Sequence, residues 1–225
     1  MVEVSAGPCG QMALTLRISE IFASLQGEST RVGLPTVFVR LTGCPLRCTW
    51  CDTTYAFRDG HSLTVQAVLD EVARHALHHV CVTGGEPLAQ AACGALLTAL
   101  CDAGYSVSLE TSGALDISAV DPRVSRIVDL KAPGSGEVSR NHLPNIDQLT
   151  PHDEVKIVLA SAADYQWARE QIAHWRLTGR CPVLLSPVSG ELEPGQLADW
   201  IVRDKLAVRF QLQLHKILWH DARGR

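Results

Sequence analysis

The sequence predicts a single α/β domain built on a mostly parallel β-sheet, and three observations support this. Apolar runs rich in β-branched residues alternate with segments of helical periodicity along most of the chain. With 225 residues and 46% hydrophobic content, the chain is long enough for one well-buried domain but cramped for two. Glycine-rich and polar motifs follow the ends of the apolar runs, where ligands collect in parallel α/β sheets.

The apolar runs predict strands at 36–41, 80–83, 106–110, 126–130, 154–159, 182–186 and 208–214. Segments with helical spacing predict helices at 64–76, 88–102, 162–174 and 193–204. The stretch 131–153 contains proline, glycine and polar residues without clear periodicity, which predicts a loop with at most one short helix. The sequence contains neither an internal repeat nor a low-complexity linker.

The overall charge argues against two classes of partner. A formal net charge of -4 and a pI near 6.1 give no field that would gather nucleic acid or an anionic membrane. No apolar stretch approaches the ~20 residues that a membrane helix needs, and the first residues lack the features of a signal peptide. We therefore expect a cytoplasmic protein.

Five of the 8 cysteines are expected to carry no chemistry. Cys81 lies in an apolar strand, and Cys93 and Cys101 lie in a helix-like segment, so these three are expected to be small buried hydrophobes. Cys9 and Cys181 are expected to be free thiols without a catalytic role.

The other three, Cys44, Cys48 and Cys51, form a Cys-x3-Cys-x2-Cys motif. Structural zinc sites and electron-transfer clusters normally take four protein ligands, so this triple indicates a site that leaves one coordination position open. On iron, a substrate-like molecule could bind at that position.

A second motif, Thr83-Gly84-Gly85-Glu86-Pro87, follows an apolar run at 80–82. Glycines there let the backbone approach a ligand without an intervening side chain, and Glu86 adds an acceptor. Together, the cysteine triple and this turn resemble the radical S-adenosylmethionine (SAM) enzymes, in which three cysteines hold a 4Fe-4S cluster whose unique iron chelates SAM. The resemblance implies a partial (βα) barrel, open on one side, with a mostly parallel sheet and a reduced helix complement.

Within that superfamily, the chain resembles the 7-carboxy-7-deazaguanine synthases of queuosine and deazapurine biosynthesis in segments 21–28, 38–44, 51–53 and 212–216. The most specific segment is Leu25-Gln26-Gly27-Glu28. The radical SAM domain would cover 18–219, with an N-terminal extension at 1–17 and a C-terminal tail at 220–225.

This resemblance implies a carbon–nitrogen lyase. Reductive cleavage of SAM would give a 5'-deoxyadenosyl radical, which takes a hydrogen from C6 of 6-carboxy-5,6,7,8-tetrahydropterin. Ring contraction and loss of ammonia would then give the product. The protein must hold the carbon-bound hydrogen beside the radical and exclude other hydrogen donors. A flavodoxin as electron donor and a homodimer are further expectations from the resemblance.

Residue by residue, the resemblance implies four sets of ligands. The cluster would bind Cys44, Cys48 and Cys51, and Mg²⁺ would bind Thr53. The substrate would bind Leu25, Gln26, Gly27, Glu28, Arg40, Thr83 and His215, with Arg40 on the substrate carboxylate and His215 at the end of the last strand. SAM would bind Trp50, Gly85, Glu86, Glu110, Asp129, Leu130, Lys131, Leu185, Ser186, Pro187 and Val188.

Each role has a structural alternative. Arg40 could be a surface charge at a strand end, and Trp50 could serve packing alone. Thr53 and its neighbour Asp52 could cap the following turn. Polar residues at strand ends are also ordinary helix caps, and a lone histidine such as His215 is more often structural.

Two departures from the family pattern affect the site. Ser29 and Thr30 follow Glu28, where the family usually continues with glycine, which puts in doubt the backbone shape of the substrate loop. The chain also extends beyond Trp219, whereas in some relatives the terminal carboxylate reaches the active site, so that contact is not assumed here.

Two other functions compete with this one. A radical enzyme that activates a partner protein would need an exposed docking surface, and the Leu25-Gln26-Gly27 segment argues against it. A non-catalytic zinc or iron–sulfur module that recognises RNA would need a fourth soft ligand and a basic face, and neither is apparent.

Overall fold

The computed structural model describes residues 14–220 and 222–224. Most of the expected N-terminal extension, including Cys9, therefore lies outside the described residues, and its last three residues, 15–17, belong to the first strand. The strands are β1 (Thr15–Leu25), β2 (Pro35–Leu41), β3 (His61–Thr64), β4 (His79–Gly84), β5 (Ser106–Thr111), β6 (Ser125–Asp129), β7 (Glu154–Leu159), β8 (Val183–Pro187) and β9 (Arg209–Phe210).

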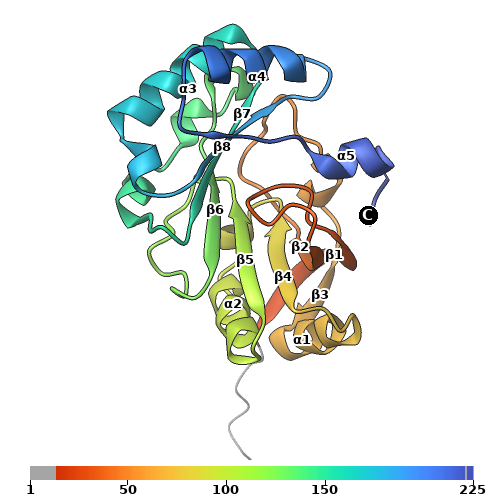
Figure 1. The fold of residues 1–225 in the computed structure, drawn as a ribbon. Coiled ribbons are helices and arrows are strands. Elements are labelled where there is room, and N and C mark those ends of the chain that lie inside the picture. The colour runs from red at the N-terminus through yellow and green to blue at the C-terminus, as the bar shows by residue number, and fades with distance from the viewer. Residues whose placement is uncertain (1–13, 221, 225) are drawn as a thin grey trace, which may run out of the picture.

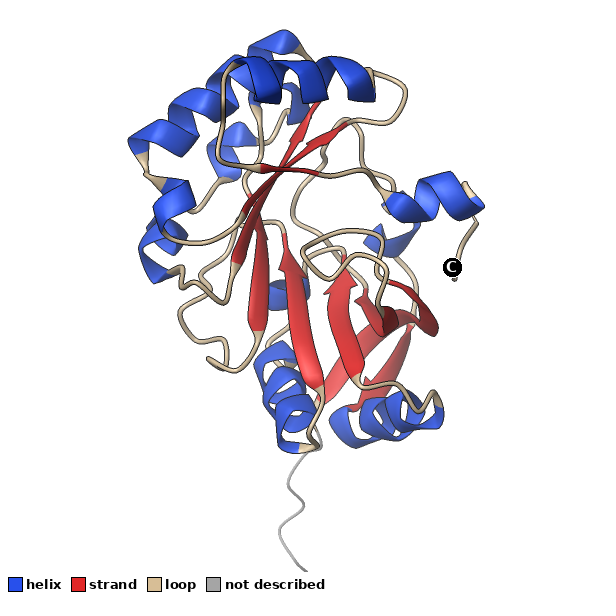
Figure 2. Ribbon diagram, viewed as in Figure 1, coloured by secondary structure: helices blue, strands red, loops and turns tan. Residues whose placement is uncertain are grey.

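These strands form one sheet in the order β3-β1-β2-β4-β5-β6-β7-β8-β9, which Figure 2 shows as a continuous twisted layer. From β2 to β9 every neighbouring pair is parallel, and β1 is antiparallel to both β2 and β3. Within the described strands, the two edges of the sheet do not pair with each other. This arrangement confirms the predicted mostly parallel sheet and the partial barrel.

The helices are α1 (Val65–Arg74), α2 (Cys93–Asp102), α3 (Ala162–His174), α4 (Pro194–Arg203) and the short α5 (Leu214–Trp219). Two of them begin at a side-chain cap, because the hydroxyl of Thr64 accepts from the Ala67 N–H and that of Ser161 accepts from the Asp164 N–H. Among the described residues, no helix has the length and apolar character needed to cross a membrane.

The helices cover the sheet in two groups, and each group has its own apolar core (Figure 1). Side chains of α1 and α2, including Val68 and Leu97, pack with residues of β1, β2, β4 and β5. Side chains of α3 and α4, including Ala168 and Leu197, pack with residues of β7 and β8. Cys81 and Cys93 are buried, as expected of small hydrophobes, whereas Cys101 is only half-buried. Cys181 is a buried free thiol.

Six of the seven predicted strands lie within one residue of their observed bounds. Strands β1 and β3 were not predicted, because Arg17 and Glu20 interrupt the apolar residues of β1, and β3 is short and mostly polar. The predicted strand 208–214 is wrong beyond Phe210, since the chain leaves the sheet there and forms α5. The stretch 131–153 is irregular, as predicted, but it contains three short 3-10 helices, at Pro133–Ser135, Val138–Arg140 and Leu143–Gln148, where at most one short helix was expected.

Candidate active site

A cavity of about 290 Å³ lies where strand ends and connecting loops meet, and it is close to the lower end of the usual range for small-molecule sites. Most of the predicted site residues line it. These are Leu25, Gln26, Gly27, Glu28, Arg40, Cys44, Cys48, Trp50, Cys51, Thr53, Thr83, Gly85, Glu110, Asp129, Lys131, Val188 and His215.

The cysteine loop rests directly on the Gly84-Gly85 turn. The Glu86 N–H donates to the Gly43 carbonyl at 2.7 Å, and a Cβ at Gly85 would lie 2.1 Å from that oxygen. Gly84 has φ +139°, and a Cβ there would lie 2.2 Å from the Leu41 carbonyl. Gly84 therefore allows the turn to contact the backbone at the end of β2, and Gly85 allows it to contact the backbone of the cysteine loop. This is a role in addition to the ligand approach that the sequence suggested.

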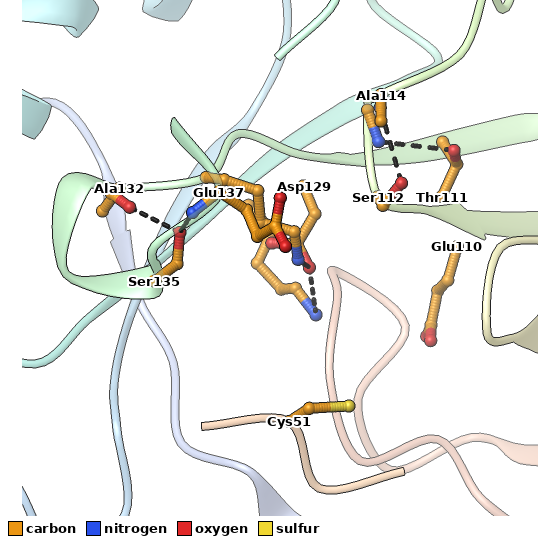
Figure 3. Close-up of polar contacts among 12 residues, drawn as sticks. Cys51, Glu110, Thr111, Ser112, Ala114, Asp129, Ala132, Ser135 and Glu137 are labelled. Carbon is orange, nitrogen blue, oxygen red and sulfur yellow. Dashed lines mark hydrogen bonds and ion pairs between the residues drawn. The ribbon is translucent and has the colours of Figure 1, made fainter. Parts of the chain in front are cut away.

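The other side of the cysteine loop is held by the segment 133–137. The Thr49 hydroxyl donates to the Gly134 carbonyl at 2.7 Å, and the Arg47 N–H donates to Glu137 Oε1 at 2.5 Å. Ser135 shapes this segment, because its hydroxyl lies between the Ala132 carbonyl and the Glu137 N–H (Figure 3). The cysteines thus lie on a loop that is fixed from two sides.

The three thiols suit a cluster better than a single ion. Cys44, Cys48 and Cys51 all line the cavity, and burial raises the pKa of the first two. In the described part of the chain, no group of three Cys, His, Asp or Glu side chains converges on one metal position. A cubane cluster needs no such convergence, since each thiolate binds a different iron atom.

The loop between β1 and β2 lies against several strands from across the sheet. Gln26 Nε2 donates to Glu110 Oε1 on β5 at 3.3 Å, and Glu28 Oε2 lies 2.6 Å from Lys156 Nζ on β7. The Thr30 N–H and hydroxyl both donate to the carboxylate of Glu154, at 3.0 and 2.5 Å. This loop therefore brings Gln26 and Glu28 to the wall of the cavity.

Ser29 resolves the question raised by the missing glycine. It has φ +69°, the left-handed conformation that glycine favours, and its N–H donates to Gln211 Oε1 at 2.7 Å. Ser29 Oγ also accepts from the Arg31 N–H at 3.1 Å. The serine thus takes the conformation that glycine favours, with hydrogen bonds that offset its steric cost.

Arg40 is directed into the cavity rather than into bulk solvent. Its side chain is only 16% exposed, and Nε donates to Glu20 Oε1 at 2.7 Å. The Tyr55 hydroxyl donates to the same oxygen at 2.9 Å. Among the described residues no hydrogen bond engages the terminal guanidinium nitrogens of Arg40, which suit a planar anion such as a carboxylate.

Thr53 precedes a short 3-10 helix at Thr54–Phe57, but its side chain makes no capping hydrogen bond there. Its hydroxyl instead donates to Asp52 Oδ1 at 3.1 Å. Asp52 Oδ2 in turn lies 3.3 Å from Gln213 Nε2 and 3.5 Å from Lys216 Nζ. The Thr53 side chain therefore does not cap the following turn.

His215 lies in the first turn of α5 and not at the end of a strand, so that part of the expectation is wrong. The Leu214 N–H donates to the Gly27 carbonyl at 3.0 Å, which ties the start of α5 to the loop between β1 and β2. The imidazole consequently faces the cavity beside Gly27, although His215 lies in a helix and not at the end of a strand.

The predicted SAM ligands separate into two groups. Asp129 and Lys131 form an ion pair at 2.8 Å on the cavity wall, and Asp129 Oδ1 is buried without a hydrogen-bond partner among the described residues. Such an acceptor fits a ligand with hydroxyl or ammonium donors. Glu110 instead accepts from Gln26 and from the Thr83 hydroxyl, on the side of the substrate loop. Figure 3 shows the Glu110 carboxylate and the Cys51 thiol directed towards the same space.

Glu86 is not placed at the cavity, which corrects its expected role. Its carboxylate is fully buried and accepts hydrogen bonds from the Thr111 hydroxyl, from the N–H and hydroxyl of Ser112, and from the Leu88 N–H. It therefore fixes the glycine turn to the end of β5.

Four other predicted SAM ligands lie away from the cavity. Leu130 and Leu185 are buried in the core beneath α3 and α4. Ser186 and Pro187 are buried at the end of β8 and do not line the cavity. Val188, the next residue along the chain, does line it.

Sequence reasoning missed several cavity residues, above all Lys156 and Gln213. Lys156 is a charged residue between the apolar residues Val155 and Ile157 of β7, a signal similar to the one that identified Arg40 in β2. The C-terminal tail also reaches the cavity, since the guanidinium of Arg223 lies 4.1 Å from the centre of the Tyr55 ring.

The chain is similar to known proteins in both sequence and fold. Residues 38–176 match the family model of the radical SAM superfamily. The chain is 49% identical to a 7-carboxy-7-deazaguanine synthase of Chlorobaculum tepidum, over 93% of this chain and 97% of that protein. It is 40% identical to the enzyme of the same name from Koribacter versatilis, over 91% and 97%. The crystal structure of QueE from Escherichia coli shares the fold, with a TM-score of 0.71 at 24% identity over 89% of this chain and 95% of that one.

Proposed function

Because the chain belongs to the 7-carboxy-7-deazaguanine synthase family of the radical SAM superfamily, we propose that its cavity converts 6-carboxy-5,6,7,8-tetrahydropterin into 7-carboxy-7-deazaguanine with loss of ammonia. The observation that carries this proposal is the convergence of two sequence motifs. The Cys44–Cys51 loop and the Gln26–Glu28 loop line the same cavity, although they belong to separate connections of the fold. A molecule bound in this cavity could therefore lie close to both the cluster ligands and the substrate loop.

When bound, the 4Fe-4S cluster and SAM supply a 5'-deoxyadenosyl radical that takes the hydrogen from C6 of the pterin. The protein's own residues orient and enclose the substrate. Gln26 and Glu28 offer hydrogen-bonding groups to the guanidine-like edge, while the terminal nitrogens of Arg40 pair with the substrate carboxylate. Holding these groups in one geometry is the main means by which the protein can guide the reaction.

The SAM site would lie along the ends of β4 and β6. Gly85, Asp129 and Lys131 line this side of the cavity, together with Trp50 and Val188. The unpartnered oxygen of Asp129 supports a contact to a donor of SAM. Cys44, Cys48 and Cys51 would hold the cluster.

We assign Mg²⁺ to Thr53, with Asp52 beside it. Magnesium keeps several waters and takes only one or two protein ligands, so a hydroxyl next to a carboxylate is a suitable partner. Thr53→Ala should weaken the response of turnover to added Mg²⁺ while leaving the iron content intact. An unchanged Mg²⁺ dependence would remove Thr53 from the metal site.

The remaining assignments concern the cellular setting. A flavodoxin as electron donor, a homodimer and a cytoplasmic location follow from the family rather than from a contact in the structure. The product would enter the queuosine pathway of tRNA modification or a related deazapurine pathway.

Turnover of the candidate substrate tests the proposal. Anaerobically reconstituted protein should be brown and contain about four irons per chain, as expected for one 4Fe-4S cluster. With reductant, SAM, Mg²⁺ and the carboxypterin, it should form 7-carboxy-7-deazaguanine and ammonia. A colourless zinc protein, or SAM cleavage that occurs only when a partner protein is added, would contradict it.

A further inference from the structure

Lys156 is a charged residue in a strand that is otherwise mostly apolar. Its neighbours in β7, Val155 and Ile157, are buried in the core beneath α3 and α4. Because side chains alternate along a strand, Lys156 points to the opposite face, where it lines the cavity. Its side chain is only 12% exposed, so the ammonium group is largely removed from water.

Two carboxylates share this ammonium group. Lys156 Nζ lies 2.6 Å from Glu28 Oε2 and 3.7 Å from Asp129 Oδ2. Burial alone would lower the pKa of Lys156, but the charges of Asp129 and Glu28 outweigh it and hold that pKa well above its usual value. Lys156 is therefore a cation at neutral pH.

The two carboxylates belong to different parts of the cavity. Glu28 lies in the loop between β1 and β2, and Asp129 ends β6 beside Lys131. Among the ion pairs of the described residues, those of Lys156 alone join the two. Gln213 supports Glu28 from the other side, because its Nε2 lies 2.9 Å from Glu28 Oε1.

Structural stability alone does not explain why a buried lysine is shared by two carboxylates of the cavity wall. Buried ion pairs contribute little net stability compared with apolar residues of similar volume, so stability alone gives little reason for a lysine here. Both carboxylates line the cavity, and Asp129 retains an oxygen without a partner among the described residues. A ligand at either carboxylate therefore changes how strongly that group attracts Lys156.

We propose that Lys156 is a positioning residue that couples the SAM site to the substrate site through its shared contacts with Asp129 and Glu28. This inference rests on the proposed function, in which Asp129 faces SAM and Glu28 faces the pterin. A donor of SAM that engages Asp129 weakens its attraction for the ammonium group, which then holds Glu28 more firmly in the orientation that receives the substrate. By reciprocity, bound substrate raises the affinity for SAM.

The test measures SAM affinity with and without the carboxypterin, on cluster-loaded protein without reductant, so that no turnover occurs. In the wild type, substrate should tighten SAM binding by about fivefold or more. In Lys156→Met this ratio should fall towards one, and Lys156→Arg, which keeps the charge, should retain part of it. Lys205→Met, which removes an exposed charge after α4, should keep the wild-type ratio.

Hydrogen exchange on the unaltered protein gives a second measurement, which stands even if Lys156→Met does not fold. SAM alone should slow amide exchange in the peptide that covers residues 26–34. Unchanged exchange there, or a wild-type affinity ratio in Lys156→Met, would overturn the inference. Product formation by the wild type is measured separately, so a failure of coupling is distinct from a failure of the proposed function.

Discussion

The ring of His215 lies directly against Gly27, although the two residues are far apart in the sequence. A Cβ at Gly27 would lie 2.3 Å from His215 Nδ1 and 3.2 Å from the His215 backbone nitrogen. The Leu214 N–H also donates to the Gly27 carbonyl at 3.0 Å. The loop between β1 and β2 and the start of α5 can therefore pack together only because residue 27 has no side chain.

Gly27→Ala should therefore impair substrate binding rather than folding. The added methyl group displaces the imidazole, and a misplacement of about 1 Å in an active site can cost on the order of a hundredfold in rate. We expect kcat/KM for the pterin to fall by about this factor while iron content stays at the wild-type level. Gly195→Ala, at a helical site with nothing within 4 Å, is the matched control. Wild-type kinetics in Gly27→Ala would show that the contact has no functional role.

Gly85→Ala should act on the cluster instead. The new Cβ would meet the Gly43 carbonyl, which is backbone and cannot move without shifting the cysteine loop. Iron content after reconstitution should fall well below that of the wild type, together with the brown absorbance. Gly94→Ala in α2, again with nothing within 4 Å, should reconstitute normally. Full iron content in Gly85→Ala would mean that the loop tolerates the shift.

Arg40→Lys should lose recognition of the substrate carboxylate. One ammonium group cannot both hold Glu20 and present a planar pair of donors, as the guanidinium can. A lost charge-assisted hydrogen bond of about 1.5–3 kcal/mol corresponds to roughly a 10–100-fold higher KM. The variant should also discriminate less well against a tetrahydropterin that lacks the carboxylate. Undiminished discrimination would assign carboxylate binding to another residue.

The pair of Arg126 and Asp153 should make stability depend on pH at the acid end. The two residues are joined by bonds of 2.8 and 2.6 Å, and Asp153 is buried. Burial alone would raise the pKa of Asp153, but hydrogen bonds from Arg126 and Thr150 outweigh it and lower that pKa. A carboxylate with a lowered pKa stabilises the fold above the unfolded value of ~3.9, and this contribution is lost as the pH falls through the folded value.

Denaturant titration of Asp153→Asn measures this contribution. At neutral pH the variant should be less stable by about 3–5 kcal/mol, because Arg126 is left as a buried, unpaired cation. The difference from the wild type should shrink below pH ~4, where the native carboxylate begins to lose its advantage. A difference that is the same at neutral and acid pH would indicate that packing, not charge, stabilises this site.

Much of the site was predictable because its chemistry is local in sequence. The spacing of Cys44, Cys48 and Cys51 and the Gly84-Gly85 turn indicated the superfamily, and each motif lies where a parallel strand ends. The six well-placed strands carry apolar runs that define them without reference to the rest of the chain.

The sequence predictions fail where tertiary contacts determine the position of a side chain. Glu86 follows the glycine turn, but the donors of Thr111 and Ser112 draw its carboxylate away from the cavity. His215 was expected at the end of a strand, whereas the hydrogen bond from Leu214 to Gly27 starts a helix there. In neither case does the local sequence contain the partner that determines the outcome.

The most direct test of the account follows one hydrogen atom. The reduced, cluster-loaded enzyme is given SAM, Mg²⁺ and the carboxytetrahydropterin deuterated at C6, and the 5'-deoxyadenosine is examined by mass spectrometry. We expect deuterium in the 5'-deoxyadenosine and formation of 7-carboxy-7-deazaguanine, because the cysteine loop and the substrate loop face one cavity. Unlabelled 5'-deoxyadenosine together with unchanged pterin would contradict it.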